Sequence, residues 1–187
     1  PLASRIVAVA SCTLVGNVLG IDAAGRPLTP VITYADTRAA PDAAALRAEL
    51  DELAVHDRTG CPLHPAYLPA RFRWFARPQP ALWAAVARWV SLGEYMELRL
   101  FGEAAVSPSV ASWSGLLDRR QVDWDAPLLD VLGVPAERLS PIAPAGSARR
   151  GLSAPFAERW RALRGVPWFP AIGDGVAANV GAGAVSP

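Results

Sequence analysis

Lysine is absent from this chain of 187 residues, and all 18 side chains of the Lys-or-Arg class are arginine. Three kinds of chemistry are thereby excluded, because there can be no phosphate-binding lysine of a Walker-A loop, no Schiff-base lysine and no lysine general base. The 18 arginines are balanced by 17 acidic residues, which leaves a formal net charge of +1. So small a charge exerts no long-range attraction on nucleic acid or on an anionic membrane, and we expect neither as a partner.

Soft metal ligands are also scarce. The two cysteines, Cys12 and Cys61, lie far apart in the sequence, and His56 and His64 are the only histidines. A zinc or iron–sulfur site needs more cysteine and histidine ligands than this, so we predict no metal site in the chain. Two cysteines without a CxxC motif are typical of a reduced protein, and we expect free thiols and a cytoplasmic location.

A long uninterrupted apolar run is missing as well. The longest apolar tract, residues 166–185, contains Pro167, Pro170 and Asp174 as well as several glycines. An aspartate near the middle of a bilayer costs about 2.5–3.5 kcal/mol, so we do not expect this tract to span a membrane. The hydrophobic fraction of 52% is sufficient for a buried core, and we expect one domain or a part of a larger one.

The pattern of apolar residues predicts a β-rich beginning. Strand-like runs cover residues 6–10, 14–21 and 30–34, and turn residues from Asp22 to Gly25 separate the second run from the third. A four-residue loop between two such runs is typical of a hairpin. A buried strand is also expected at residues 166–172, near the end of the chain.

Helical periodicity covers most of the remaining chain. Proline at the first helical position and apolar spacings of three and four predict helices that begin near Pro41 and Pro80. The first is expected to carry Leu46, Leu50 and Leu53 on one face, and the second Leu82, Val86, Trp89 and Val90. Further helices are predicted at residues 94–101, with Gly102 as C-cap, at 155–163 and at 176–184. Strands followed by helices, and a last strand that leads into a helix, indicate an α/β fold.

The first candidate site is Asp174, which stands between Gly173 and Gly175 after the last predicted strand. Ligands of open α/β sheets bind at the carboxyl ends of strands, and the carboxylate is expected at such an end. The glycines allow a ligand to approach the backbone, and the first N–H groups of the following helix can stabilise an anion. The alternative interpretation is that Asp174 only caps the closing helix.

The second candidate is the segment Tyr34-Ala-Asp-Thr-Arg38, at the end of a predicted strand. Asp36 and Arg38 are separated by one residue at the end of the strand. Their side chains can therefore lie on the same side of the chain and present a carboxylate and a guanidinium together. Such a pair can hold a polyhydroxylated ligand, and arginine also suits a carboxylate. The alternative is a structural ion pair that caps the next helix.

Six sequence segments follow one another in the order of a known family. They are Tyr34-Ala-Asp-Thr-Arg38, Thr59-Gly-Cys-Pro-Leu-His-Pro65, Arg71-Phe-Arg-Trp74, Arg99-Leu-Phe-Gly-Glu103, Ser109-Val-Ala-Ser-Trp-Ser-Gly-Leu-Leu-Asp118 and Gly173-Asp-Gly175. In these segments the chain resembles the FGGY carbohydrate kinases, and it looks most like their gluconokinase branch. The resemblance covers essentially the whole chain.

The resemblance implies a ribonuclease H-like (actin-like ATPase) α/β fold that is incomplete and lacks the first strands of the domain. Residues 1–187 would form part of the amino-terminal, sugar-binding domain of a kinase, and the ATP-binding carboxy-terminal domain would be absent. ATP and magnesium are implied for the full-length parent protein only. The isolated chain is therefore expected to have no turnover.

The resemblance also implies roles for individual residues. Asp174 falls on the family's catalytic aspartate, which takes the proton of the sugar hydroxyl, and Gly173 and Gly175 would lie close to the transferred phosphate. The positions implied to bind the sugar are Asp36, Thr37, Arg38 and Tyr67, the last of which would lie near the segment that walls the sugar pocket.

Two alternatives to this function stay open. The parent kinase could act on a pentulose such as xylulose, or on a polyol, in place of gluconate or a related sugar acid. The chain could also be a non-catalytic remnant that serves as a binding or interaction module. Because the absent strands would expose a sheet edge and apolar helix faces, we expect the isolated chain to form a homodimer, exchange strands or aggregate.

Overall fold

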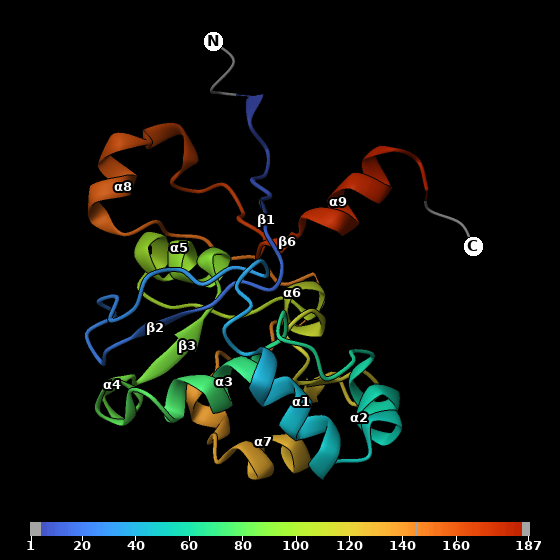
Figure 1. The fold of residues 1–187 in the computed structure, drawn as a ribbon. Helices are drawn as coiled ribbons and strands as arrows, with labels where there is room; N and C mark the ends of the chain where they lie inside the picture. The colour runs from blue at the N-terminus through green and yellow to red at the C-terminus, as the bar shows by residue number, and fades with distance from the viewer. Residues whose placement is uncertain (1–4, 145, 185–187) are drawn as a thin grey trace.

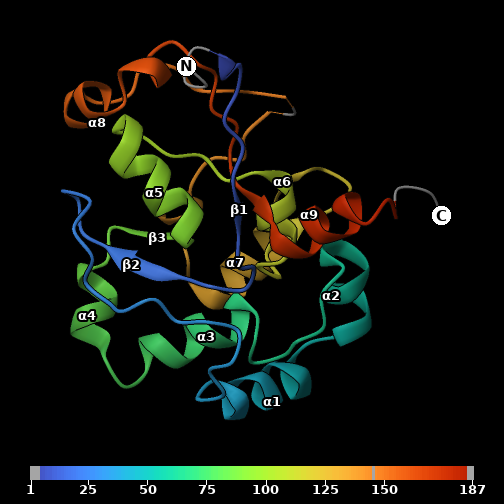
Figure 2. The ribbon, with the colours of Figure 1, turned by 90° about the horizontal axis from the view of Figure 1, so that it is seen from above.

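Two short strands from opposite ends of the chain form a parallel pair. In the computed structural model, which describes residues 5–144 and 146–184, β1 (Cys12–Thr13) pairs with β6 (Ile172–Gly173). Figures 1 and 2 show the two strands side by side, with α8 (Ala154–Arg159) and α9 (Asp174–Gly181) on opposite sides of β1. Almost all of the remaining chain forms the connection between the two strands.

That connection consists of short helices and two further strand pairs, in which β2 pairs antiparallel with β3, and β4 with β5. Besides α8, which lies between η2 and η3, its elements in chain order are β2 (Leu19–Ile21), α1 (Ala40–Glu49), α2 (Glu52–Thr59), α3 (Leu68–Ala76), α4 (Pro80–Ala85), β3 (Arg88–Val90), α5 (Leu92–Phe101), α6 (Pro108–Ser112), β4 (Leu117–Asp118), β5 (Asp123–Trp124), α7 (Ala126–Leu132), and the 3₁₀ turns η2 (Ala136–Arg138) and η3 (Arg161–Leu163).

The main hydrophobic core lies between β3 and the helices α1, α3 and α7. At its centre is Trp89 of β3, whose ring centroid lies 5.3 Å from that of Phe72 and 4.8 Å from that of Phe75, both on α3. Leu46 of α1 and Leu128 of α7 are fully buried in the same cluster. Buried aromatic rings contribute large apolar areas, so this core fixes α3 and the loop that leads into it.

Several sequence predictions are confirmed. The turn after β2 forms at Asp22, whose carboxylate accepts hydrogen bonds from two backbone amides, and Gly25 adopts a left-handed φ of 74°. The helix near Pro41 is α1, and α5 ends at Gly102 with a φ of 80°. The remaining strand-like runs are shorter than predicted. Residues 6–10 and 30–34 contribute single bridges, and Gly16, with a φ of 61°, interrupts the run at 14–21.

The helix predicted to run from Pro80 through Val90 is wrong in its second half. α4 ends at Ala85, Val86 is extended with a ψ of 114°, and the following residues form β3. In that strand Val90 pairs with Leu19 of β2. The apolar spacing of this segment also fits a helix, but pairing with a distant strand decides its conformation because tertiary contacts override local propensity.

Two other local predictions are also wrong. Leu53 belongs to α2 and is 81% exposed, because the chain leaves the helical conformation between α1 and α2. The tract at 166–172 is not one continuous buried strand: Trp168 forms a single bridge with Val9, Ile172 pairs with Cys12 of β1, and Phe169 is exposed. Pro167 and Pro170 have no amide hydrogen to donate, which limits the ladder. Among the described helices, none has the length and apolar character needed to cross a membrane.

Candidate functional site

Asp174 lies where β6 passes into α9, at the carboxyl end of the parallel pair. It is the first residue of α9, and Gly173 precedes the helix in an extended conformation. Its half-buried carboxylate accepts one hydrogen bond in the described structure, 3.0 Å from the amide of the adjacent Gly175. A capping aspartate would stand before the helix and accept from the second or third helical amide. The structure therefore does not support the alternative in which Asp174 is only a cap.

Close packing around Gly173 fixes the backbone that leads into Asp174. The Gly173 amide donates to the Ser109 hydroxyl at 3.1 Å, and a Cβ atom at Gly173 would lie only 2.7 Å from Cγ1 of Val15. The Ser107 hydroxyl donates to the carbonyl of Ala171 at 2.6 Å, so the start of α6 holds β6 from one side. A Cβ atom at Gly175, in contrast, would meet nothing within 4 Å. The space next to Asp174 is therefore open on the side of Gly175.

Asp36 and Arg38 form the predicted pair. Arg38 donates from Nε to both carboxylate oxygens at 3.0 Å and from Nη2 to Oδ2 at 2.6 Å, and its guanidinium lies over the ring of Trp74 at 4.3 Å. These hydrogen bonds lower the pKa of Asp36 and raise that of Arg38. The pair does not cap α1, because Ala39 is the N-cap and no side chain caps it. Thr37, between them, is exposed.

Tyr67 stands directly before α3, half-buried between two loops. A Cβ atom at Gly115 would lie 3.0 Å from the Tyr67 Cβ, so the two segments of the chain are in close contact here. Burial raises the pKa of the Tyr67 hydroxyl, and a hydrogen bond with the Cys61 thiol contributes in the same direction. Burial likewise raises the pKa of Cys61. Both cysteines are free thiols, Cys61 buried and Cys12 exposed.

The turn at Gly16 connects these segments. A Cβ atom at Gly16 would lie 3.3 Å from the Cβ of Tyr34 and 3.4 Å from the carbonyl oxygen of Ala66. The segment of Asp36 and the segment of Tyr67 therefore meet at Gly16. Its neighbour Val15 touches Gly173, next to Asp174. The structure thus gathers all three predicted site segments around one turn.

Arg71 of α3 is a residue that the sequence analysis did not assign to the site. Its side chain is almost fully buried, at 1% exposure. Three backbone carbonyls accept its hydrogen bonds: Gly16 at 2.6 Å, Thr33 at 2.7 Å and Pro65 at 3.1 Å. Burial lowers its pKa to about 10, so it still carries a positive charge at neutral pH. The only signal in the sequence was its place in the Arg71-Phe-Arg-Trp74 segment.

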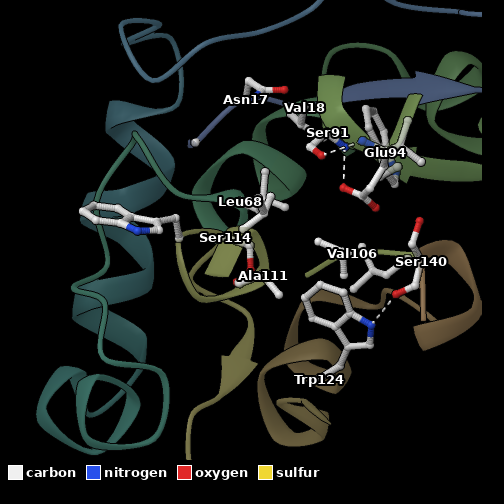
Figure 3. Close-up of a pocket in the computed structure, with 16 residues that line it drawn as sticks. Asn17, Val18, Leu68, Ser91, Glu94, Val106, Ala111, Ser114, Trp124 and Ser140 are labelled. Atoms are coloured by element: carbon white, nitrogen blue, oxygen red, sulfur yellow. Dashed lines mark hydrogen bonds between the residues drawn. The ribbon is translucent and has the colours of Figure 1, made fainter. Parts of the chain in front are cut away.

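A small cavity next to the same turn is too small for a sugar. It has a volume of about 30 Å³, and Glu94, Ser140 and Trp124 are among the residues that line it (Figure 3). Ligand pockets usually measure roughly 300–1,000 Å³, whereas this volume suits a water molecule. Glu94 accepts a hydrogen bond from the Ser91 amide at 2.7 Å, and burial raises the pKa of its carboxyl. This cavity belongs to the core and not to the candidate site.

Comparison with known proteins identifies the family. The model of the N-terminal domain of the FGGY family of carbohydrate kinases matches residues 2–181. The chain belongs to this family. Among curated relatives of this FGGY domain, gluconokinase of Bacillus subtilis (strain 168) is 28% identical over 97% of the chain and 35% of the relative. Autoinducer-2 kinase of Yersinia pestis (strain Pestoides F) is 30% identical over 98% of the chain and 35% of the relative.

Solved structures agree with this assignment. The FGGY domain matches a xylulose kinase from Rhodospirillum rubrum with a TM-score of 0.90 and 26% identity, over 97% of the chain and 37% of that structure. A gluconate kinase from Lactobacillus acidophilus gives a TM-score of 0.90 at 21% identity, over 98% of the chain and 38% of that structure. The predicted ribonuclease H-like fold is confirmed. The chain spans about a third of the length of the curated relatives it matches.

Proposed function

We propose that this FGGY domain is the sugar-binding part of an ATP-dependent kinase that phosphorylates a hydroxyl of gluconate or a related sugar acid. Asp174 acts as the base that takes the hydroxyl proton. The observation that carries the proposal is the position of its carboxylate, which lies at the end of β6 and does not cap α9. Phosphoryl transfer has a loose transition state, so a well-placed ionised aspartate is sufficient and a strong base is unnecessary.

Asp36, Thr37 and Arg38 bind the substrate in this proposal, and Tyr67 forms a wall of the pocket. In the described part of the chain, Arg38 uses Nε and Nη2 on Asp36, which leaves Nη1 for a ligand. A guanidinium suits a carboxylate, which gluconate has and which xylulose and glycerol lack. Autoinducer-2 is the second candidate substrate, because kinases named for it reach 30% identity with this chain.

ATP and magnesium are bound, in our proposal, mainly by a carboxy-terminal domain outside residues 1–187, with Gly173 and Gly175 near the transferred phosphate. The described residues contain no group of three or more side chains suited to hold a metal ion. Asp174 alone does not make a magnesium site, so these residues do not fit the metal and we derive no step through it. The chain by itself should therefore have no turnover. An ATP-dependent enzyme with free thiols fits the cytoplasm.

A binding comparison tests the substrate assignment. Isothermal titration calorimetry of the full chain should detect binding of gluconate, and weaker binding or none of xylulose, glycerol and autoinducer-2. Equal affinity for gluconate and glycerol would overturn the role given to Arg38, and stronger binding of autoinducer-2 would favour the second candidate. Gluconate-dependent consumption of ATP by this chain alone, abolished by Asp174→Asn, would overturn the proposal that a second domain is needed.

We also propose that the isolated chain self-associates through the edge of β1 that pairs with no other described strand. Among the described strands, β1 pairs with β6 alone, and exposed strand edges promote pairing between chains. Light scattering should show a dimer or larger species. A monodisperse monomer with a cooperative thermal transition would contradict this part of the proposal.

A further inference from the structure

We propose that Arg71 is a positioning residue that fixes the segments of Asp36 and Tyr67 against the Gly16 turn, and that the affinity for carbohydrate depends on it. The inference rests on the proposed function, because it deepens the account of the same site. Arg71 itself is too deeply buried, at 1% exposure, to touch a substrate. Its effect must therefore pass through the segments that it holds.

Each hydrogen bond of Arg71 ends on a different segment. Nη1 donates to Gly16, in the turn that touches Gly173 through Val15. Nη2 donates to Thr33, three residues before Asp36. Nε donates to Pro65, two residues before Tyr67. One planar guanidinium therefore holds the segments of Asp36 and Tyr67 against the Gly16 turn, and Val15 of that turn packs against Gly173.

The charge of Arg71 makes this arrangement costly to disturb. None of the ion pairs among the described residues includes Arg71, so carbonyl oxygens compensate most of its buried charge. The Asp36 carboxylate acts on it through space and favours the charged form. Movement of one segment would leave a charged N–H group buried without an acceptor, which is strongly unfavourable. The three segments are therefore expected to move together or not at all.

Arg138 offers a matched control outside the site. Its Nη2 donates to the carbonyls of Trp83 at 2.7 Å and Val86 at 2.8 Å, and its guanidinium lies 5.2 Å from the centre of the Trp83 ring. Arg138 thus binds backbone carbonyls as Arg71 does. It joins η2 to the end of α4, however, and contacts none of the predicted site segments. Replacement of Arg138 should cost stability without changing ligand affinity.

The test compares Arg71→Lys, Arg71→Met and Arg138→Met in the full chain, first without ligand. Amide hydrogen exchange is followed at Val18, Asp36 and Tyr67, which donate to Ile32, Thr33 and His64. We expect exchange in Arg71→Met to rise at all three amides together, by about tenfold or more, and to rise less in Arg71→Lys. In Arg138→Met the increase should be confined to the amides of Trp83 and Val86, at the end of α4.

Calorimetry with gluconate is the second readout. We expect the dissociation constant to rise by about tenfold or more in Arg71→Met, by less in Arg71→Lys, and to stay within about twofold in Arg138→Met. If Arg71→Met does not fold, Arg71→Lys decides alone. Faster exchange at only one of the three amides, or equal loss of affinity in Arg71→Lys and Arg138→Met, would overturn the inference. Absence of gluconate binding in the unaltered chain would overturn the proposed substrate, whereas the exchange measurement would still decide the role of Arg71.

Discussion

Both carboxylate oxygens of Asp36 accept hydrogen bonds from the guanidinium of Arg38, and the shortest of these, from Nη2 to Oδ2, is 2.6 Å long. The same guanidinium lies 4.3 Å from the centre of the Trp74 ring. Two contacts therefore orient one exposed cation, although an exposed ion pair by itself contributes little to stability. An oriented, accessible guanidinium suits the substrate-binding role that we propose for Arg38.

Replacement of Arg38 should separate binding from stability. We predict that Arg38→Gln weakens gluconate binding by about tenfold or more, since a charge-assisted hydrogen bond is lost, and lowers the free energy of unfolding by no more than about 1 kcal/mol. Arg26→Gln is the matched control, because Arg26 forms a similar exposed pair with Asp22 in the turn after β2. Calorimetry and urea denaturation measure the two quantities. Equal affinity in the two variants would contradict the prediction.

Substitutions of two glycines should change the free energy of unfolding in opposite directions, because Gly173 is closely packed against Val15 and Gly181 is not packed. Gly173→Ala should lower the free energy of unfolding by about 1–3 kcal/mol, because the new methyl group would lie 2.7 Å from Cγ1 of Val15. Gly181→Ala, in α9 with nothing within 4 Å, should raise it by about 0.5–1 kcal/mol, because alanine favours a helix. Urea denaturation measures both. A Gly173→Ala variant with unchanged stability would contradict the close packing of Val15 against Gly173.

The ion pair between Arg58 and Asp125 joins α2 to the start of α7. Asp125 is fully buried, accepts from Arg58 at 2.7 Å and caps α7 through the Leu128 amide. We predict that Asp125→Ala costs about 3–5 kcal/mol of stability, because it leaves the arginine without its partner and removes a helix cap. Asp57→Ala, which breaks exposed contacts with Arg119 and Arg120, should cost about 0–1 kcal/mol. Thermal melting of the two variants in parallel compares these losses of stability. Similar melting temperatures would contradict the prediction that Asp125 contributes more to stability than Asp57.

Glu94 predicts a dependence of stability on pH. Burial raises the pKa of its carboxyl in the folded chain above the ordinary value of 4.5. Between these two pKa values the folded state binds more protons than the unfolded state, so the contribution of Glu94 to the unfolding free energy falls as the pH rises. Glu94→Gln removes this effect and keeps an oxygen for the Ser91 amide. The unfolding free energy of the variant minus that of the unaltered chain should therefore increase from about pH 4.5 upwards. A difference that stays constant or decreases with pH would contradict a raised pKa of Glu94 in the folded chain.

Local signals in the sequence were sufficient where the local chain decides the structure. Pro41, Gly102 and the turn from Asp22 to Gly25 each act within a few residues, and the corresponding elements form as predicted. The segment that ends in Val90 could not be predicted in the same way. Its spacing suits a helix, and only the presence of β2 as a partner turns it into a strand.

The same distinction between contacts that are local in the sequence and contacts between distant residues holds at the candidate site. Proximity along the chain was sufficient to predict the pair of Asp36 and Arg38. The role of Arg71 depends on Gly16 and Thr33, which lie far from it in the sequence and reach it only after folding. An arginine within an apolar helix also gives no sign of whether its partner is a carboxylate, a ligand or the backbone.

The most direct test of the proposed kinase introduces Asp174→Asn into the protein that contains this chain in its native source. The variant and the unaltered protein are purified from that source and compared. General base catalysis contributes about 10²–10⁴-fold to rate, so gluconate-dependent ATP consumption should fall by that factor. The dissociation constant for gluconate should stay within about twofold, because asparagine keeps the shape of the side chain. Turnover within about twofold of the unaltered protein would show that Asp174 is not the base, and would contradict the account of this site.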